Sequence, residues 1–359
     1  MSALFAPIKL RDLTIRNRIF VSPMCQYSCE DGLPNQWHLV HLGSRAVGGA
    51  GLVTCEASGV TPEGRISPQD AGVWSEAHAQ AWAPIVAFIK AQGAAAGMQL
   101  AHAGRKASTF APWRGSGAVS IGCGGWETLA PSAVAFAPNY PMPREMTHAD
   151  IDKCVEDFVW GAQHALSAGF DLVELHMAHG YLMHEFLSPF SNLRQDDYGG
   201  SLENRMRLPL RVAEAVRKTW PAHLPVAVRI SACDWKEGGW DIAQSIVLCK
   251  ALKEIGIDLI DVSSGGNVPD AKITLVPGYQ VPFSAAIRNE AAIATSAVGL
   301  ITSPAQAEQI VATGQADSVS LARAVLRDPY WPRHAAMELG VEPQWPDQYK
   351  RAGAGPLGR

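Results

Sequence analysis

The chain has 359 residues, of which 47% are hydrophobic and 18% charged, and its formal net charge is −4. It has no Lys/Arg-rich block, and no uncharged apolar run approaches the ~20 residues that cross a bilayer, so nucleic acids and membranes are not expected partners. The N-terminal residues lack a signal-peptide pattern and the seven cysteines form no C-x-x-C pair. We therefore expect a cytoplasmic protein without a disulfide framework or structural zinc.

Eight short apolar runs divide the chain, and several are rich in Val and Ile. Each has the length of a strand, and continuous apolar character is typical of strands buried on both faces of a parallel sheet. The runs are Ile19–Met24, Gly51–Ala57, Gly97–His102, Leu172–His176, Pro225–Ile230, Leu259–Ser263, Ile293–Val298 and Ser318–Leu321.

Segments with helical spacing of apolar residues alternate with these runs. Thr147 and Ser201 stand where helix N-caps are expected, and Gly169, Gly256 and Gly314 stand where helices should end. Helices are expected at 76–92, 147–168, 201–220, 241–255, 304–313 and 329–339, and His38 and His41 of the first H-x-x-H pair lie on a further helix candidate.

This alternation predicts an α/β protein whose residues 1–359 form a single (β/α)₈ TIM barrel, with a doubly wound open sheet as the chief rival. Residues 1–17 are expected to form an N-terminal hairpin that closes one end. Residues 103–146 and 180–200 extend the loops after strands three and four, on the face where barrel enzymes hold their active sites. Residues 341–359 are expected to form a C-terminal tail.

Three polar rings, His176, His179 and Tyr181, follow the fourth predicted strand within six positions. Two imidazoles can hold a polarised oxygen, and a phenol beside them can give up a proton. Metal binding by His176, His179 and His184 is the competing interpretation. It is disfavoured because no suitably placed carboxylate or cysteine completes a site, so we predict no metal.

Polar side chains also interrupt other apolar strands. Gln99 and Arg229 are costly to bury without partners, and a planar heterocycle that acquires negative charge would satisfy both. Glycines and Arg323 follow the last three strands, where barrels often bind phosphate. Neither a G-x-G-x-x-G after a strand nor a P-loop is present, so a Rossmann site and a nucleoside-triphosphate loop are not indicated.

Four motifs together make the chain resemble the old yellow enzyme family of FMN-dependent ene-reductases. The similarity is greatest to the bacterial subclass of xenobiotic reductase A and related NADPH dehydrogenases. It covers nearly the whole chain, and the motifs that carry it are Ser22–Tyr27 (SPMCQY), Gln99–Lys106 (QLAHAGRK), His176–Tyr181 (HMAHGY) and Ser188–Arg205.

The resemblance implies a tightly bound FMN across the barrel mouth. Gln99 and Arg229 match residues at the N1 and C2-carbonyl edge of the flavin, Cys25 matches a cysteine beside the ring, and Gly299 and Arg323 match phosphate-binding positions. The full set of expected cofactor-binding residues is Ser22, Pro23, Met24, Cys25, Ala57, Gln99, Arg229, Ser264, Gly265, Gly299, Ala322 and Arg323.

The resemblance also implies the reaction, in which NADPH, or NADH, reduces the flavin and an α,β-unsaturated ketone, aldehyde or imide then takes its place. His176 and His179 match the residues that bind the carbonyl oxygen, and Tyr181 matches the proton donor. Substrate contacts are expected from Tyr27 and Lys106. A further contact is expected from Arg351, on a tail that reaches a neighbouring subunit of a homodimer or homotetramer.

Two other functions remain open from the residues alone. One is a flavin-binding storage or sensor protein, which the intact His176, His179 and Tyr181 disfavour, and the other is a flavin-free barrel lyase or aldolase. The Cys-rich insertion of the larger dienoyl-CoA reductase relatives is absent. Val298 stands where xenobiotic reductase A has a tryptophan, so a wider pocket is expected.

Overall fold

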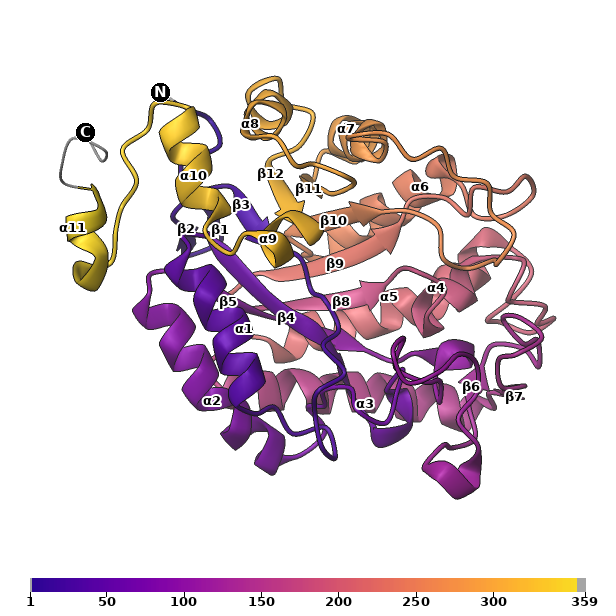
Figure 1. Cartoon of the computed structure of the whole chain (residues 1–359). Coiled ribbons are helices and arrows are strands. Elements are labelled where there is room, and N and C mark those ends of the chain that lie inside the picture. The colour runs from indigo at the N-terminus through magenta and orange to yellow at the C-terminus, as the bar shows by residue number, and fades with distance from the viewer. Residues whose placement is uncertain (1, 354–359) are drawn as a thin grey trace.

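The computed structural model describes residues 2–353 and has a closed barrel of eight parallel strands, in the order β10-β11-β12-β3-β4-β5-β8-β9 (Figure 1). The predicted TIM barrel is confirmed, and the open sheet is excluded because β9 pairs with β10 to close the ring. The strands are β3 (Ile19–Val21), β4 (Leu52–Gly59), β5 (Ala95–Ala101), β8 (Leu172–Met177), β9 (Val226–Ser231), β10 (Leu259–Ser263), β11 (Ala294–Ala297) and β12 (Ser318–Leu321).

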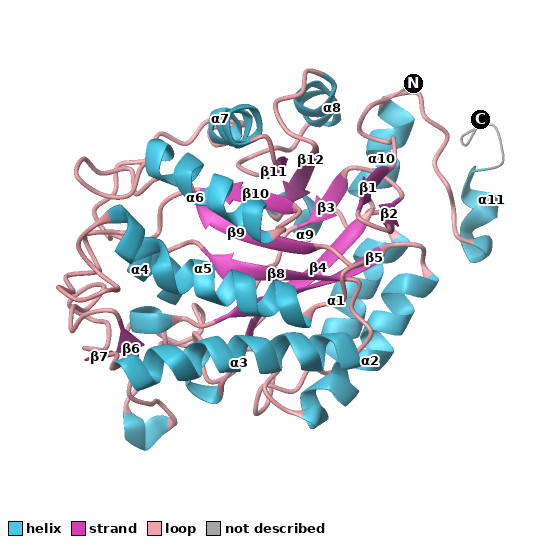
Figure 2. Cartoon of the chain, turned by 180° about the vertical axis from the view of Figure 1, so that it is seen from behind, coloured by secondary structure: helices cyan, strands magenta, loops and turns pink. Residues whose placement is uncertain are grey.

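Helices surround the strands, as Figure 2 shows from the opposite side. The sequence predicts most of them but misses α4, α7, α9 and α11, which are short or weakly patterned. The helices are α1 (Gln36–Val47), α2 (Glu76–Ala91), α3 (His148–Ser167), α4 (Leu182–Leu187), α5 (Leu202–Thr219), α6 (Ile242–Ile255), α7 (Val281–Ala291), α8 (Pro304–Ala312), α9 (Arg323–Arg327), α10 (Trp331–Glu338) and α11 (Lys350–Gly353).

The predicted helix boundaries have local causes. The Thr147 hydroxyl accepts the Asp150 N–H at 3.2 Å, and the Asp150 carboxylate accepts the Thr147 N–H at 2.8 Å, which forms a capping box for α3. Ser201 caps α5 by accepting the N–H of Asn204. Gly256 follows α6 with φ 97°, a left-handed conformation that glycine adopts without a Cβ penalty.

One end of the barrel is closed by the antiparallel hairpin of β1 (Ile8–Leu10) and β2 (Leu13–Ile15). Its apolar side chains pack against the first inward-facing residues of the strands. We call this group the lower cluster; it consists of Ile8, Leu10, Ile15, Phe20, Leu52, Ala95, Leu172, Ala227 and Leu259. The core is therefore apolar at the hairpin end, and any polar interior lies toward the other end.

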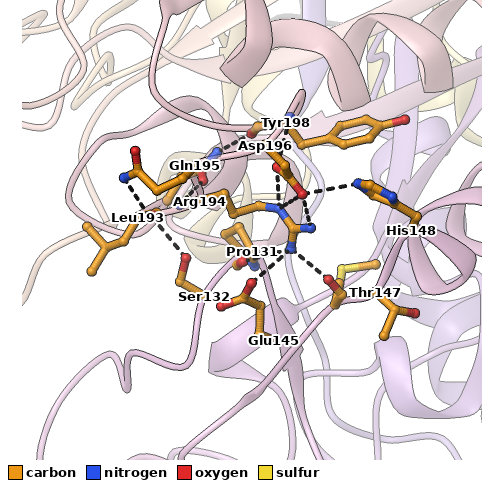
Figure 3. A network of polar contacts seen from close by, with 12 residues as sticks. Pro131, Ser132, Glu145, Thr147, His148, Leu193, Arg194, Gln195, Asp196 and Tyr198 are labelled. Carbon is orange, nitrogen blue, oxygen red and sulfur yellow. Dashed lines mark hydrogen bonds and ion pairs between the residues drawn. The ribbon is translucent and has the colours of Figure 1, made fainter.

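Long loops extend from that other end, and two of them are bound to each other around Arg194 (Figure 3). The Arg194 guanidinium donates to the carbonyls of Pro131 and Met146 at 3.1 and 2.6 Å and pairs with Asp196 at 2.6 Å. Asp196 also lies 3.1 Å from the His148 ring. These contacts join the 188–200 loop to the segment that carries the short strands β6 (Leu129–Ala130) and β7 (Arg144–Glu145).

The C-terminal tail lies at the hairpin end of the barrel. Helix α11 stands beyond β1 and β2, on the side opposite to β6 and β7, in both views (Figures 1 and 2). Residues 354–359 of the expected tail at 341–359 lie outside the described residues. Of residues 2–353, no helix combines the length and apolar character that a membrane crossing needs.

Candidate active site

The C-terminal end of β8 brings three polar rings together. His176 is the last but one residue of this strand, and the chain then turns through His179 to Tyr181, which immediately precedes α4. The His176 ring lies edge-on to the His179 ring, with centroids 5.2 Å apart, and to the Tyr181 ring, with centroids 5.0 Å apart. One cluster therefore offers two imidazoles and a phenol at the barrel mouth.

The turn that carries these rings is strained and held on several sides. His179 has φ 61°, which is uncommon for a residue with a Cβ and is often found at functional sites. The Lys106 ammonium donates to the carbonyls of His179 and Gly266 at 2.8 and 3.0 Å, and the His179 N–H donates to the Ser231 hydroxyl at 2.9 Å. A Cβ at Gly266 would lie 2.7 Å from the His179 backbone, so the two loops can approach this closely only with glycine there.

Burial keeps both imidazoles neutral at pH 7. Desolvation first, and then the positive charge of Arg229, hold the pKa of His176 and of His179 well below 6.5. His176 Nδ1 faces the Ala178 N–H at 3.3 Å, so the ring proton is on Nε2. The His179 Nε2 lies 2.7 Å from the Ser263 hydroxyl, which can donate or accept. A neutral imidazole with a fixed N–H can donate to an oxygen without transferring its proton.

Tyr181 remains a protonated phenol across the physiological range. Burial is the largest cause that raises its pKa, followed by the nearby Cys25 and Tyr27. The Lys106 nitrogen lies 5.0 Å from the centre of the Tyr181 ring. Burial lowers the pKa of Lys106 itself to about 8. The phenol is thus available as a proton donor rather than as a base.

Cys25 and Tyr27 follow β3 and face the same region. Tyr27 has φ 47° and packs edge-on against Trp113, with ring centroids 5.6 Å apart. Burial, followed by the charges of Asp70 and Glu56, raises the pKa of Cys25 well above its usual range, so this side chain is a neutral thiol. A thiol of this kind is a polarisable contact and not an activated nucleophile.

The upper interior of the barrel contains polar side chains with incomplete partners. The Gln99 amide donates to Glu174 at 2.7 Å, and the Arg229 Nε lies 3.3 Å from Asp261. Within the described chain, the buried Arg229 Nε and the Ser22 hydroxyl have no hydrogen-bond partner. Unpaired buried donors are rare, and at a barrel mouth they indicate where a polar ligand binds.

A cavity of about 220 Å³ opens where β11 and β12 end. Its lining includes Ser263, Gly299, Ala322 and Arg323, together with Val298. Gly299 has φ 121°, and Arg323 is exposed at the start of α9. Backbone amides and a guanidinium in such a hollow are typical of a phosphate site in a barrel.

The remaining predicted residues fall into two groups. Most lie at strand ends around the mouth: Pro23 and Met24 after β3, Ala57 on β4 beside Gln99 in the sheet register, and Ser264 and Gly265 after β10. Arg351 does not join them, because it is exposed on α11 at the hairpin end of its own barrel. Within residues 2–353, no group of three or more His, Cys, Asp or Glu side chains is arranged to hold a metal ion.

Four polar residues around the site were not among the predicted site residues: Glu174, Ser231, Asp261 and Ser263. Ser231 and Ser263 contact His179, whereas Glu174 and Asp261 contact Gln99 and Arg229. A period-two interpretation of the strands contains the signal for two of them. Glu174 stands two residues before His176, and Ser231 two residues after Arg229, so each pair faces the interior.

Comparison with known proteins places this site in context. The model of the NADH:flavin oxidoreductase / NADH oxidase family matches residues 3–342. An NADPH dehydrogenase of Geobacillus thermodenitrificans is 50% identical over 352 residues, 98% of each chain. The structure of an old yellow enzyme homologue from Zymomonas mobilis has a TM-score of 0.78 and 28% identity, covering 96% of this chain and 95% of that one. A 2-naphthoyl-CoA reductase has a TM-score of 0.85 and 26% identity, covering 94% of this chain; this chain spans only 52% of that reductase.

Proposed function

Because the chain belongs to the NADH:flavin oxidoreductase / NADH oxidase family, and within it to the old yellow enzyme group, we propose that it reduces the activated C=C bond of α,β-unsaturated carbonyl compounds. The family is one of FMN-dependent oxidoreductases that use a nicotinamide as reductant. We propose both the carbonyl class of the substrate and the roles of the single residues. The observation that carries it is the convergence of His176, His179 and Tyr181.

The residues around the mouth fit FMN. The buried Ser22 hydroxyl has no hydrogen-bond partner, and the Arg229 Nε has an ion pair with Asp261 at 3.3 Å but no hydrogen bond. The cavity beside Arg323 can receive a phosphate. A guanidinium near the pyrimidine edge favours the negative charge that reduction places there. The residues proposed to hold the cofactor are Ser22, Pro23, Met24, Cys25, Ala57, Gln99, Arg229, Ser264, Gly265, Gly299, Ala322 and Arg323.

When bound, FMN supplies hydride chemistry between the nicotinamide and an alkene carbon. His176 and His179 are neutral, so each can donate one N–H to the carbonyl oxygen of the substrate and withdraw electron density from its β-carbon. Tyr181 carries its proton at neutral pH and delivers it to the α-carbon. Lys106 holds the turn through two carbonyls, so its main effect is to fix the position of His179.

Cys25 and Tyr27 are proposed to form the wall of the substrate pocket that faces Tyr181. Both lie within electrostatic reach of Tyr181, whose pKa they help to raise. Val298 lines the neighbouring cavity beside Arg323, and we propose that its small side chain also leaves the substrate pocket wide. A storage or sensor protein would need no proton donor above its flavin, and a flavin-free lyase would not need a buried guanidinium whose Nε has no hydrogen bond.

Steady-state kinetics test the proposed function. Since the nicotinamide and the enone are proposed to occupy the same mouth in turn, initial rates with NADPH and cyclohexenone should follow a ping-pong pattern, with parallel double-reciprocal lines. Intersecting lines, which indicate a ternary complex, would contradict the shared site. A colourless preparation that cannot be reconstituted with FMN would contradict the flavin assignment.

The C-terminal tail is proposed to contribute Arg351 to the site of a neighbouring copy in a homodimer or homotetramer. Arg351 is exposed and lies at the hairpin end of its own barrel, so it cannot serve its own mouth in this arrangement. Removing the residues after Pro346 should raise the KM for the enone and leave the colour of the protein unchanged. Arg351→Ala should reproduce most of the effect, whereas Lys350→Ala should not. An unchanged KM for the enone in the truncated protein would contradict the proposed role of the tail.

A further inference from the structure

Three ionisable residues form a layer inside the barrel, directly above the lower cluster. Strands β8, β9 and β10 each contribute one apolar residue to that cluster. Two positions later, on the same inward face, stand Glu174, Arg229 and Asp261. All three are buried, and the sheet register places Arg229 beside Asp261. We call these three residues and Gln99 the polar floor.

Gln99 and Arg229, which are proposed to contact the pyrimidine edge of the flavin, each lie next to a different acidic residue of the polar floor. The Gln99 amide nitrogen donates to the Glu174 Oε1 at 2.7 Å, and the sheet register sets the two residues side by side. The Arg229 Nε lies 3.3 Å from the Asp261 Oδ2 without hydrogen-bond geometry. The two carboxyl groups therefore have different partners: Glu174 accepts from an amide, and Asp261 pairs with a guanidinium.

The charges in the floor do not balance if both acids are ionised. One guanidinium faces two carboxyl groups in the buried interior. Ionising both acids there would cost free energy, because two negative charges would share one positive charge away from water. Burial, followed by the charge of Asp261, raises the pKa of Glu174 to about 8. Burial also raises the pKa of Asp261, and the charge of Arg229 opposes the rise in both acids. The two differ in geometry, because Arg229 makes its ion pair with Asp261, at 3.3 Å. Asp261 is thus the ionised acid and Glu174 the neutral one.

We propose that Glu174 and Asp261 are positioning residues for the flavin, the first orienting the Gln99 amide as a neutral acceptor and the second offsetting and aiming the Arg229 guanidinium. Together they set the midpoint potential of the bound flavin. This inference rests on the proposed function, because it takes Gln99 and Arg229 as flavin contacts. A floor with both acids ionised would cancel Arg229 and oppose the negative charge of a reduced flavin.

The test is a potentiometric titration of the FMN-loaded variants, with the dissociation constant for FMN measured alongside. Asp261→Asn leaves Arg229 uncompensated, so the reduced form should be favoured at least about tenfold, a rise of about 30 mV for a two-electron couple. Glu174→Gln exchanges one neutral acceptor for another and should leave the potential nearly unchanged. Glu174→Leu removes the acceptor and should weaken FMN binding roughly tenfold.

Asp317→Asn is the matched control, because Asp317 pairs with Arg288 at 3.0 Å just before β12, away from the mouth. An unshifted potential in Asp261→Asn, or an equal shift in Asp317→Asn, would overturn the inference. If Asp261→Asn does not fold, the FMN affinities of Glu174→Gln and Glu174→Leu test the inference instead. Equal affinities in these two variants would refute the orienting role of Glu174. A wild-type protein that binds no FMN would instead refute the proposed function itself.

Discussion

Replacing Tyr181 with phenylalanine should slow reoxidation of the reduced enzyme by cyclohexenone by about 10²- to 10⁴-fold, the usual contribution of a positioned proton donor. The substitution removes only the hydroxyl and keeps the edge-on packing against His176. Reduction by NADPH needs no proton from this phenol, so its rate should change little. Anaerobic stopped-flow absorbance at the flavin band separates the two half-reactions.

Tyr198→Phe provides the control for this substitution, because Tyr198 lies on the 188–200 loop and its hydroxyl contacts Arg211 of α5 rather than the turn after β8. It should leave both half-reactions at the wild-type rates. If Tyr181→Phe slowed the two half-reactions equally, the phenol would be acting through the shape of the pocket. The assignment of Tyr181 as proton donor would then fail.

Replacing His176 or His179 with alanine should lower kcat/KM for cyclohexenone by about 10²- to 10³-fold, the effect of removing one donor to a developing oxyanion. The double variant should lose less than the product of the two single effects, because the imidazoles act on one oxygen. Loss of rate should appear in reoxidation and in enone binding. Titration of the oxidised enzyme with cyclohexenone, followed through the flavin absorbance, measures the binding part.

The first H-x-x-H pair, His38 and His41, supplies the control for the histidine substitutions. His41 is buried in α1, where its carbonyl accepts from Ser44 and Arg45 of the same helix, so His41→Ala should change stability without changing the enone kinetics. The lowered pKa of the two catalytic imidazoles also fixes the pH profile. Because they become charged only well below pH 6.5, reoxidation should show no break near that value. A break near pH 6.5 that vanished in His176→Ala would contradict the neutral donors.

The barrel could be predicted because its signals are local. Strand-length apolar runs, the Thr147 capping box and the glycines after helices each act within a few residues. Helix α7 was missed because its apolar face is narrow and its helical state is supported by packing against α6 and β11. Local pattern gives little information about such a segment.

The site was only partly predictable for the same physical reason. The motif after β8 placed His176, His179 and Tyr181 on one turn, which sequence spacing can specify. The contacts of Lys106 with the His179 carbonyl and of Ser263 with the His179 ring join loops that lie far apart in the chain. They depend on strand order and register, which no single segment encodes. The pairing of Arg229 with Asp261 likewise arises only when β9 meets β10.

One anaerobic experiment tests the central claim most directly. Stoichiometric NADPH should bleach the flavin absorbance of the purified protein, and cyclohexenone added afterwards should restore it with formation of one equivalent of cyclohexanone. The restored absorbance and the saturated ketone together require that the reduced flavin delivers hydride to the alkene carbon of the enone. A flavin that NADPH reduces but that neither cyclohexenone nor a maleimide reoxidises would contradict the account.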